Sequence, residues 1–100
     1  MVKVKVNKNN NNYQSIDILG HAGFSIHGKD IVCSAISSIV ITSINGILSI
    51  NDEALKYEDN KEGIKIYNIK NDNITIKLLD NMINLLKELE DNYPKNINVL

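Results

Sequence analysis

Tryptophan is absent from this 100-residue chain, and it has one cysteine, one proline and 5% aromatic residues. The single cysteine, Cys33, cannot form an internal disulfide, so the fold does not depend on an oxidising compartment. No large excess of positive charge is present either, because the net charge is −1 and the pI is about 6.1. A domain that binds nucleic acid usually has a basic face and a high pI. We therefore expect no direct nucleic-acid binding. A chain of 100 residues has the length of one domain, which we expect to span residues 1–100.

A long apolar leader is also missing. Residues 1–6 alternate apolar and charged residues and lack the apolar run of a signal peptide. One uncharged stretch, residues 31–50, is about long enough to cross a bilayer. Serines, a threonine and an asparagine interrupt it, which makes membrane insertion unfavourable. We expect a buried helix, no membrane partner and a cytoplasmic protein.

Hydrophobic periodicity predicts an α+β domain. Apolar residues alternate in residues 2–6 and 14–21, which predicts two antiparallel strands joined by a loop at residues 8–12. The remaining expected elements, in chain order, are a helix from Ile31 to Ile44 stopped near Asn45-Gly46, strands at 53–57 and 63–69 around a turn at 58–62, a leucine-faced helix from about Asn71 to Pro94, and a short strand near 97–100. In the first helix the expected apolar stripe includes Val32, Ala35, Ile36, Ile39, Val40, Ser43 and Ile47. The order ββαββαβ indicates a mostly antiparallel sheet with two helices packed on it.

The residues with chemical potential gather between Gly20 and Ser37. This stretch contains both histidines, the cysteine and three of the five glycines. Asp30 is a candidate N-cap, which would place Cys33 in the first helical turn. Unpaired N–H groups and the positive end of the helix dipole lower a thiol pKa there, and Lys29 adds positive charge. His21 ends the strand that leads into the same loop, so a cysteine nucleophile with a histidine base is one reading.

Two other readings use the same residues. A zinc site could draw on His21, His27, Asp30 and Cys33, although the close ligand pairs of typical zinc sites are missing. In a purely structural reading, Cys33 is a small buried hydrophobe, His21 bonds a backbone carbonyl, and the glycines shape turns. The glycines do not form a phosphate-binding loop, because neither known glycine signature is present. Chemistry alone leaves these alternatives open.

A family resemblance bears on the choice. Gly20-His21-Ala22, followed by Gly28-Lys29-Asp30-Ile31-Val32-Cys33-Ser34-Ala35-Ile36-Ser37, resembles the signature of the Prp family, the bacterial ribosomal-processing cysteine proteases. The order of elements after the motif is similar too, so the resemblance covers nearly the whole chain. Ser34 stands where alanine is commoner in the family.

The resemblance implies a small homodimeric α+β enzyme without cofactor or metal. It implies that the substrate is the N-terminal peptide of a ribosomal protein precursor, from which the enzyme removes a short extension; the protein is L twenty-seven of the large subunit. The family's nucleophile falls on Cys33 and its catalytic histidine on His21. The expected alternative is a non-catalytic ribosomal-protein-binding or assembly module that uses the same groove.

Supporting roles follow from the same resemblance. The family's acid falls on Asp30, which we expect to cap the helix rather than orient the imidazole, and its serine falls on Ser37 as a polar contact. The segment from Ala22 to Lys29 is a candidate lid over the peptide. His27 lies outside the motif. The expected substrate-loop residues are Gly20, Ala22, Gly23 and Gly28.

Overall fold

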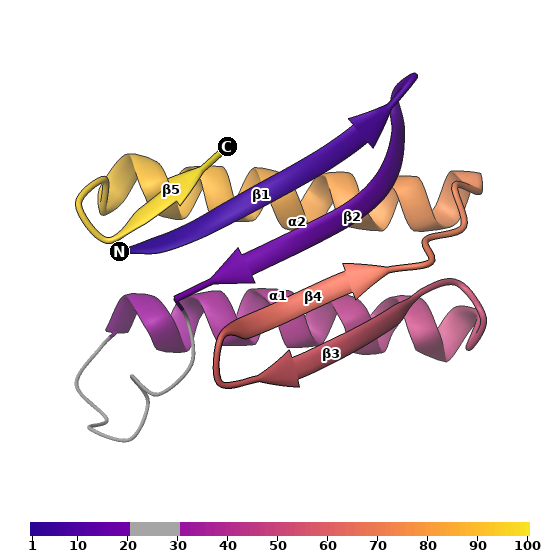
Figure 1. Cartoon of the computed structure of the whole chain (residues 1–100), viewed down its shortest axis with the longest axis horizontal. Helices are drawn as coiled ribbons and strands as arrows, with labels where there is room; N and C mark the ends of the chain where they lie inside the picture. Colours follow the sequence, from indigo (N-terminus) through magenta and orange to yellow (C-terminus); the bar gives the residue numbers. More distant parts are fainter. Residues whose placement is uncertain (21–30) are drawn as a thin grey trace.

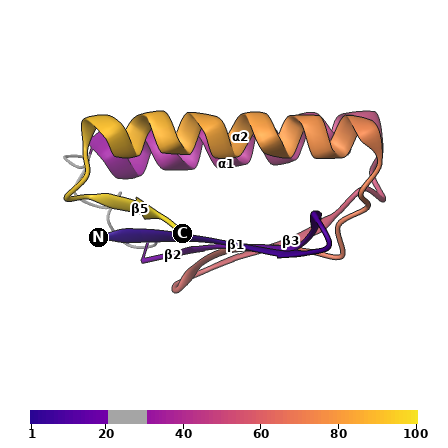
Figure 2. The ribbon, with the colours of Figure 1, turned by 90° about the horizontal axis from the view of Figure 1, so that it is seen from above.

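The computed structural model describes residues 1–20 and 31–100, and it forms two layers. The elements in chain order are β1 (Val2–Asn9), β2 (Asn12–Leu19), α1 (Ile31–Ile50), β3 (Lys56–Asn60), β4 (Gly63–Tyr67), α2 (Asn73–Asn92) and β5 (Ile97–Val99). Both helices lie side by side on one face of the sheet, and the other face is open (Figures 1 and 2). The α+β class and the order ββαββαβ are confirmed.

The sheet has the strand order β3-β4-β2-β1-β5. Three of its four pairings are antiparallel, namely β1 with β2, β2 with β4, and β3 with β4. The C-terminal strand β5 lies parallel to β1, which gives the sheet its second edge. The sheet is therefore mostly antiparallel, as predicted.

The core lies between the helices and the sheet. Alternate strand residues such as Val4, Ile18 and Ile64 are buried and occupy neighbouring register positions. The helices contribute these buried residues: Val32, Cys33, Ile36, Val40, Ile44 and Ile47 from α1, and Thr75, Leu79, Met82, Ile83 and Leu86 from α2. The leucine-rich face of the second helix is thus a core face, as its period predicted.

The first helix is longer than expected. It continues through Asn45-Gly46 to Ile50, because Ile44 and Ile47 extend its buried stripe beyond the glycine. A helical glycine costs only about 1 kcal/mol relative to alanine, which such burial offsets. In the predicted stripe, Ser43 is half-buried like Ala35 and Ile39, and its hydroxyl donates to the Ile39 carbonyl at 2.7 Å. The predicted stripe left out Ile44, which is fully buried.

Turn chemistry shifts the ends of several strands. Asn10 and Asn11 have φ of 53° and 66°, so a two-residue turn joins β1 and β2 and both strands extend into the predicted loop. The strand expected at 53–57 begins only at Lys56, since Ala54 donates its N–H to Asn51 in a turn. The predicted turn at 58–62 is only two residues long, Lys61 and Glu62. The strand expected at 63–69 ends at Tyr67, before Asn68 at φ 49°.

The second helix begins and ends with identifiable caps. Asp72 is its N-cap and accepts the Thr75 N–H at 2.8 Å, and Tyr93 is its C-cap, directly before Pro94. The hydrogen bond donated by the Thr75 backbone N–H lowers the pKa of the Asp72 carboxyl. These features confirm the predicted start near residues 71–73 and the proline stop.

By length and composition alone, the uncharged helix α1 is long and apolar enough to cross a membrane, with a mean hydropathy of 2.0. The core helix of a soluble protein can have the same length and composition. In the structure its buried stripe packs on the sheet and its flank packs on α2 (Figure 2). Only 33% of its most apolar window is buried, so the expected buried helix is covered by the sheet and by α2 and is exposed on its remaining side.

Candidate active site

The candidate site lies where β2 ends and α1 begins, at one end of the molecule (Figure 1). Gly20, Cys33 and Ser37 belong to the described residues. The other predicted site residues, His21, Ala22, Gly23, Gly28 and Asp30, lie outside the described residues, as does His27. The expected contact between His21 and Cys33 therefore remains a prediction.

Cys33 is the third residue of α1, inside the first turn, as predicted. Its side chain is 4% exposed. It begins the buried stripe that continues at Ile36 and Val40, with the spacing of one helix face. The thiol therefore lies on the side of α1 that faces the sheet, near the end at which β2 leaves the sheet.

The start of α1 favours negative charge. The first four N–H groups of a helix have no partner within the helix, and the helix dipole is positive at this end. The first turn of α1 contains no acidic residue that would oppose this effect. The start of α1 thus provides a positive electrostatic field near Cys33.

Ser37 lies one turn after Cys33 on the same helix and is half-buried. Side chains four residues apart in a helix are neighbours on one face. The structure therefore brings the predicted serine to the cysteine's side of α1. This position suits a polar contact.

Gly20 has a backbone conformation that favours glycine. Its φ is +81°, and an added Cβ would lie 3.1 Å from the carbonyl oxygen of Met1. The Gly20 N–H donates to the Glu62 carbonyl at 3.1 Å. The turn between β3 and β4 thus holds the end of β2 directly before the motif histidine. Sequence reasoning missed this contact, because nothing local to Gly20 indicates a partner 42 residues away (62 − 20).

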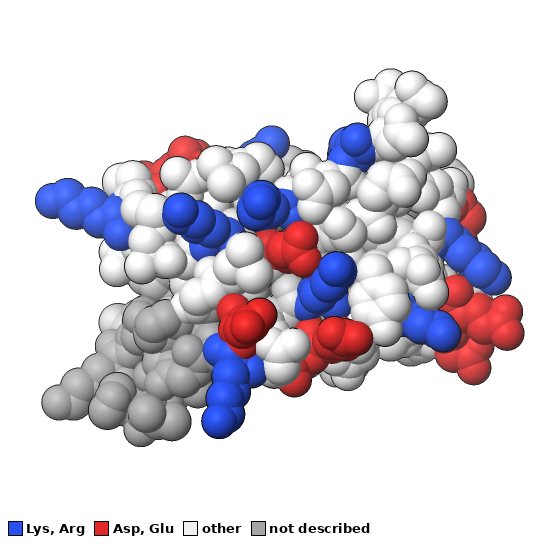
Figure 3. Space-filling model, in the orientation of Figure 1, with Lys and Arg blue, Asp and Glu red and all other residues white. Residues whose placement is uncertain are grey.

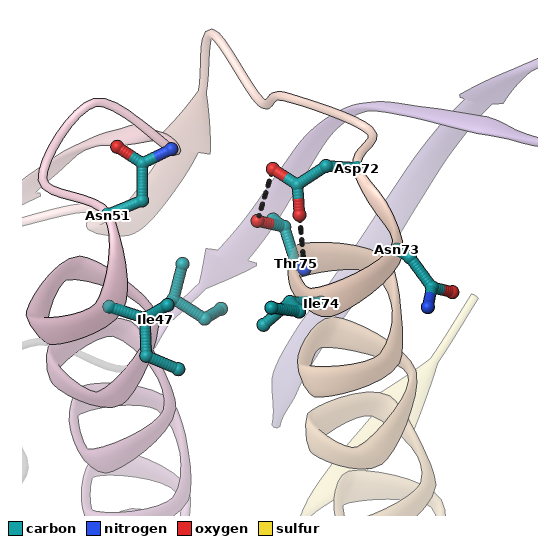
Figure 4. Close-up of a pocket in the computed structure, with 7 residues that line it drawn as sticks. Ile47, Asn51, Asp72, Asn73, Ile74 and Thr75 are labelled. Atoms are coloured by element: carbon teal, nitrogen blue, oxygen red, sulfur yellow. Dashed lines mark hydrogen bonds between the residues drawn. The ribbon is translucent and has the colours of Figure 1, made fainter.

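A separate cavity of about 450 Å³ lies at the opposite end of the helix layer. Figure 4 shows Ile47 of α1 and Ile74 of α2 facing each other across it, with the Asp72 cap at its rim. Ile47 is 14 residues after Cys33, which corresponds to roughly 21 Å along a helix. This cavity is therefore not part of the candidate site.

Of the four residues considered as zinc ligands, only Cys33 belongs to the described residues. Among residues 1–20 and 31–100, no three histidine, cysteine, aspartate or glutamate residues are grouped as metal ligands would be. His21, His27 and Asp30, the other three residues of the zinc reading, lie outside the described residues.

Comparison with known proteins adds independent evidence. The sequence profile of the family described as "Cysteine protease Prp" matches residues 1–98. The ribosomal processing cysteine protease Prp of Staphylococcus aureus is 32% identical over 81 residues, which are 78% of this chain and 76% of that protein. The protein of the same name from Bacillus subtilis is 35% identical over 34 residues, which are 34% of this chain and 30% of that protein.

Solved structures agree with these sequence matches. The S. aureus protease Prp in complex with a substrate peptide has a TM-score of 0.86 and 25% identity, covering 100% of this chain and 98% of that one. The same protease with a covalently linked product peptide has a TM-score of 0.84 and 27% identity, covering 99% of this chain and 97% of that one. A fold and a sequence profile therefore point to the same family.

Proposed function

The chain belongs to the Prp family of cysteine proteases and is a peptidase, and from this premise we propose that it is a processing endopeptidase that acts on a ribosomal protein precursor. The proposed substrate is large-subunit ribosomal protein L twenty-seven, whose N-terminal extension would be removed in the cytoplasm. The observation that carries the proposal is the position of Cys33 in the first turn of α1, within a motif that resembles the family signature.

In the proposed reaction, the Cys33 sulfur attacks the scissile carbonyl carbon. The proton of the thiol passes to His21, either before the attack or during it, and the carbonyl oxygen becomes an oxyanion. His21 then gives this proton to the leaving amine as the C–N bond breaks, which leaves a thioester on Cys33. Water, activated by His21, hydrolyses the thioester and restores the thiol.

The helix start would stabilise the oxyanion. Backbone N–H groups at the start of α1 are the proposed donors, and one such donor is typically worth about 3 kcal/mol in the transition state. Asp30 is proposed to cap this turn, and Ser37 to make a polar contact one turn further on. Gly20, Ala22, Gly23 and Gly28 would shape the loop that contacts the peptide.

We expect Cys33→Ala to abolish cleavage of the full-length L twenty-seven precursor from the same organism. Mass spectrometry locates the cut made by the wild-type protein. His21→Ala should lose activity by the same test, whereas His27→Ala should keep most of it. The matched control is Ser34→Ala, which removes one oxygen from an exposed neighbour of Cys33.

Cleavage by the Cys33→Ala protein would contradict the proposed nucleophile. Binding of the precursor without any cut by the wild-type protein would favour the non-catalytic binding module. The rate of Cys33 alkylation near neutral pH distinguishes the two as well, because a catalytic thiolate reacts faster than an ordinary thiol.

We also propose that the chain forms a homodimer through α1. This 20-residue helix contains no charged residue. Its exposed side carries Ser38, Thr42, Asn45 and Ser49, and Ile31 and Ile50 are 74% and 59% exposed at its two ends. A second copy could cover this uncharged helix face without removing any charged side chain of α1 from water.

A further inference from the structure

A hollow of about 340 Å³ lies on the open face of the sheet, opposite the helices. It is lined by Lys5, Asp17, Leu19, Glu58, Asn60, Glu62, Gly63, Ile64 and Lys65. The register places Gly63 between Leu19 on β2 and Asn60 on β3. Because Gly63 has no side chain, the sheet surface has a depression between the side chains of Leu19 and Asn60.

The glycine in the hollow cannot be replaced without moving the backbone. Gly63 has φ +138°, and an added Cβ would lie 1.9 Å from the carbonyl oxygen of Ile18. The preceding residue, Glu62, accepts the N–H of Gly20. The hollow is therefore built by the backbone and lies beside the residue that precedes the motif histidine.

Charges on the hollow follow the strand register. Lys5, Asp17, Lys65 and Glu58 face one another in turn across β1, β2, β4 and β3, so the signs alternate along this row. Figure 3 shows the intermixed acidic and basic side chains of the open face. Glu62 lies outside the row, which leaves three carboxylates against two ammonium groups.

One apolar side chain stands among these polar groups. Leu19 is 39% exposed and forms a wall of the hollow beside Glu62 and Gly63. Lysine and arginine side chains match this combination, because they place an aliphatic stem on apolar surface and a cationic group beside carboxylates. A ribosomal protein is rich in such residues, since it must neutralise RNA phosphates.

We infer that this hollow is a subsite for a lysine or arginine side chain of the substrate. The aliphatic stem lies on Leu19, and the cationic group faces Glu62, which lies outside the alternating row of charges. This inference rests on the proposed function, because the proposed substrate supplies the basic residues. It adds a substrate contact on the sheet face that is separate from the chemistry at Cys33.

The test compares Glu62→Lys with Asp52→Lys, an equal charge change at an exposed turn residue elsewhere on the chain. The probe is a synthetic peptide that spans the extension and the first ten residues of mature L twenty-seven. A second peptide carries glutamine at every lysine and arginine. For the first peptide, we expect Glu62→Lys to raise KM about five-fold with kcat within about two-fold, and high salt to shrink the effect. Asp52→Lys should leave KM unchanged, and the glutamine peptide should not distinguish Glu62→Lys from wild type.

Equal KM values for Glu62→Lys and Asp52→Lys would overturn the subsite while the endopeptidase proposal stands. If the wild-type protein does not cut the peptide, fluorescence anisotropy measures its binding instead. Binding that weakens in Glu62→Lys but not in Asp52→Lys would support the subsite, while the absence of cleavage would contradict the endopeptidase proposal. Binding that does not depend on Glu62, including no binding, would overturn the subsite.

Discussion

At the residue scale, Tyr13 joins the β1–β2 hairpin to the second helix. Its hydroxyl donates to the Asp80 carboxylate on α2, and the residue is 3% exposed. Its backbone N–H donates to the Asn71 side chain at 2.7 Å, and its carbonyl accepts from the same side chain at 3.0 Å. The Lys8 ammonium lies 4.6 Å from the ring centroid. Tyr13 thus connects segments that are 58 and 67 residues apart in sequence.

We expect Tyr13→Phe to lower the free energy of unfolding by about 1 kcal/mol, because the hydrogen bond from the buried tyrosine to the exposed Asp80 carboxylate is lost. Urea titration measures this, with Tyr57→Phe on the exposed edge strand as the matched control. An equal effect of both variants would contradict the role of the Tyr13 hydroxyl.

The same contact makes stability depend on alkaline pH. Burial first, and then the hydrogen bond and charge of Asp80, raise the pKa of Tyr13 above its usual value of 10.0. The folded state therefore holds this proton more tightly than the unfolded state. The contribution is fully present below pH 10 and is lost as the pH rises through the raised value. In Tyr13→Phe, the decline in unfolding free energy above pH 10 should be shallower.

At the element scale, two glycines show how burial and backbone geometry decide tolerance. Gly46 lies in the exposed part of α1, and an added Cβ would meet nothing within 4 Å. Gly63 begins β4 at φ +138°, where the Ile18 carbonyl leaves no room for a Cβ. The helix would accept alanine at Gly46, whereas the turn before β4 requires glycine at position 63.

We expect Gly46→Ala to raise the free energy of unfolding by about 0.5–1 kcal/mol, because alanine loses less backbone entropy in a helix. Gly63→Ala should lower it by more than about 3 kcal/mol or prevent folding, since both strain and a backbone clash oppose it. Thermal unfolding followed by circular dichroism compares the two. If Gly46→Ala lowered the free energy of unfolding instead, the prediction would be wrong, because a Cβ at this position meets no atom of the chain within 4 Å.

At the scale of the whole molecule, the helix layer has one uncharged outer surface on α1 and a charged one on α2. Exposed α2 residues include Lys77, Lys87, Glu88 and Asp91. On α1 the exposed residues are serines, a threonine, an asparagine, a glycine and isoleucines. This asymmetry is the physical support for the proposed dimer.

Thr42→Asp should convert the proposed dimer to monomers at micromolar concentration, because pairing α1 with a second copy would bury two unpaired carboxylates. Size-exclusion chromatography with light scattering measures the mass. The matched control is Asn81→Asp, which adds the same charge to the exposed side of α2. A monomeric wild-type protein would contradict the proposal.

The sequence alone predicted the order of the elements, because alternating valines and isoleucines and the leucine stripe record which faces are buried. It also predicted that Cys33 lies in the first turn of a helix, since that position depends only on where the helix begins. Element ends were less predictable. The extension of α1 past Gly46 and the late start of β3 depend on packing and turn contacts that local pattern does not encode.

Only the tertiary structure decided which distant segments meet. The strand order β3-β4-β2-β1-β5 brings Glu62 to Gly20 and forms the hollow beside it, and the second helix supplies Asp80 to Tyr13. These contacts join residues more than 40 positions apart, and a chain read in order contains no signal for them. The motif that contains Cys33 could be read from neighbouring residues, whereas the contact of Gly20 with Glu62 comes from the pairing of β2 with β4.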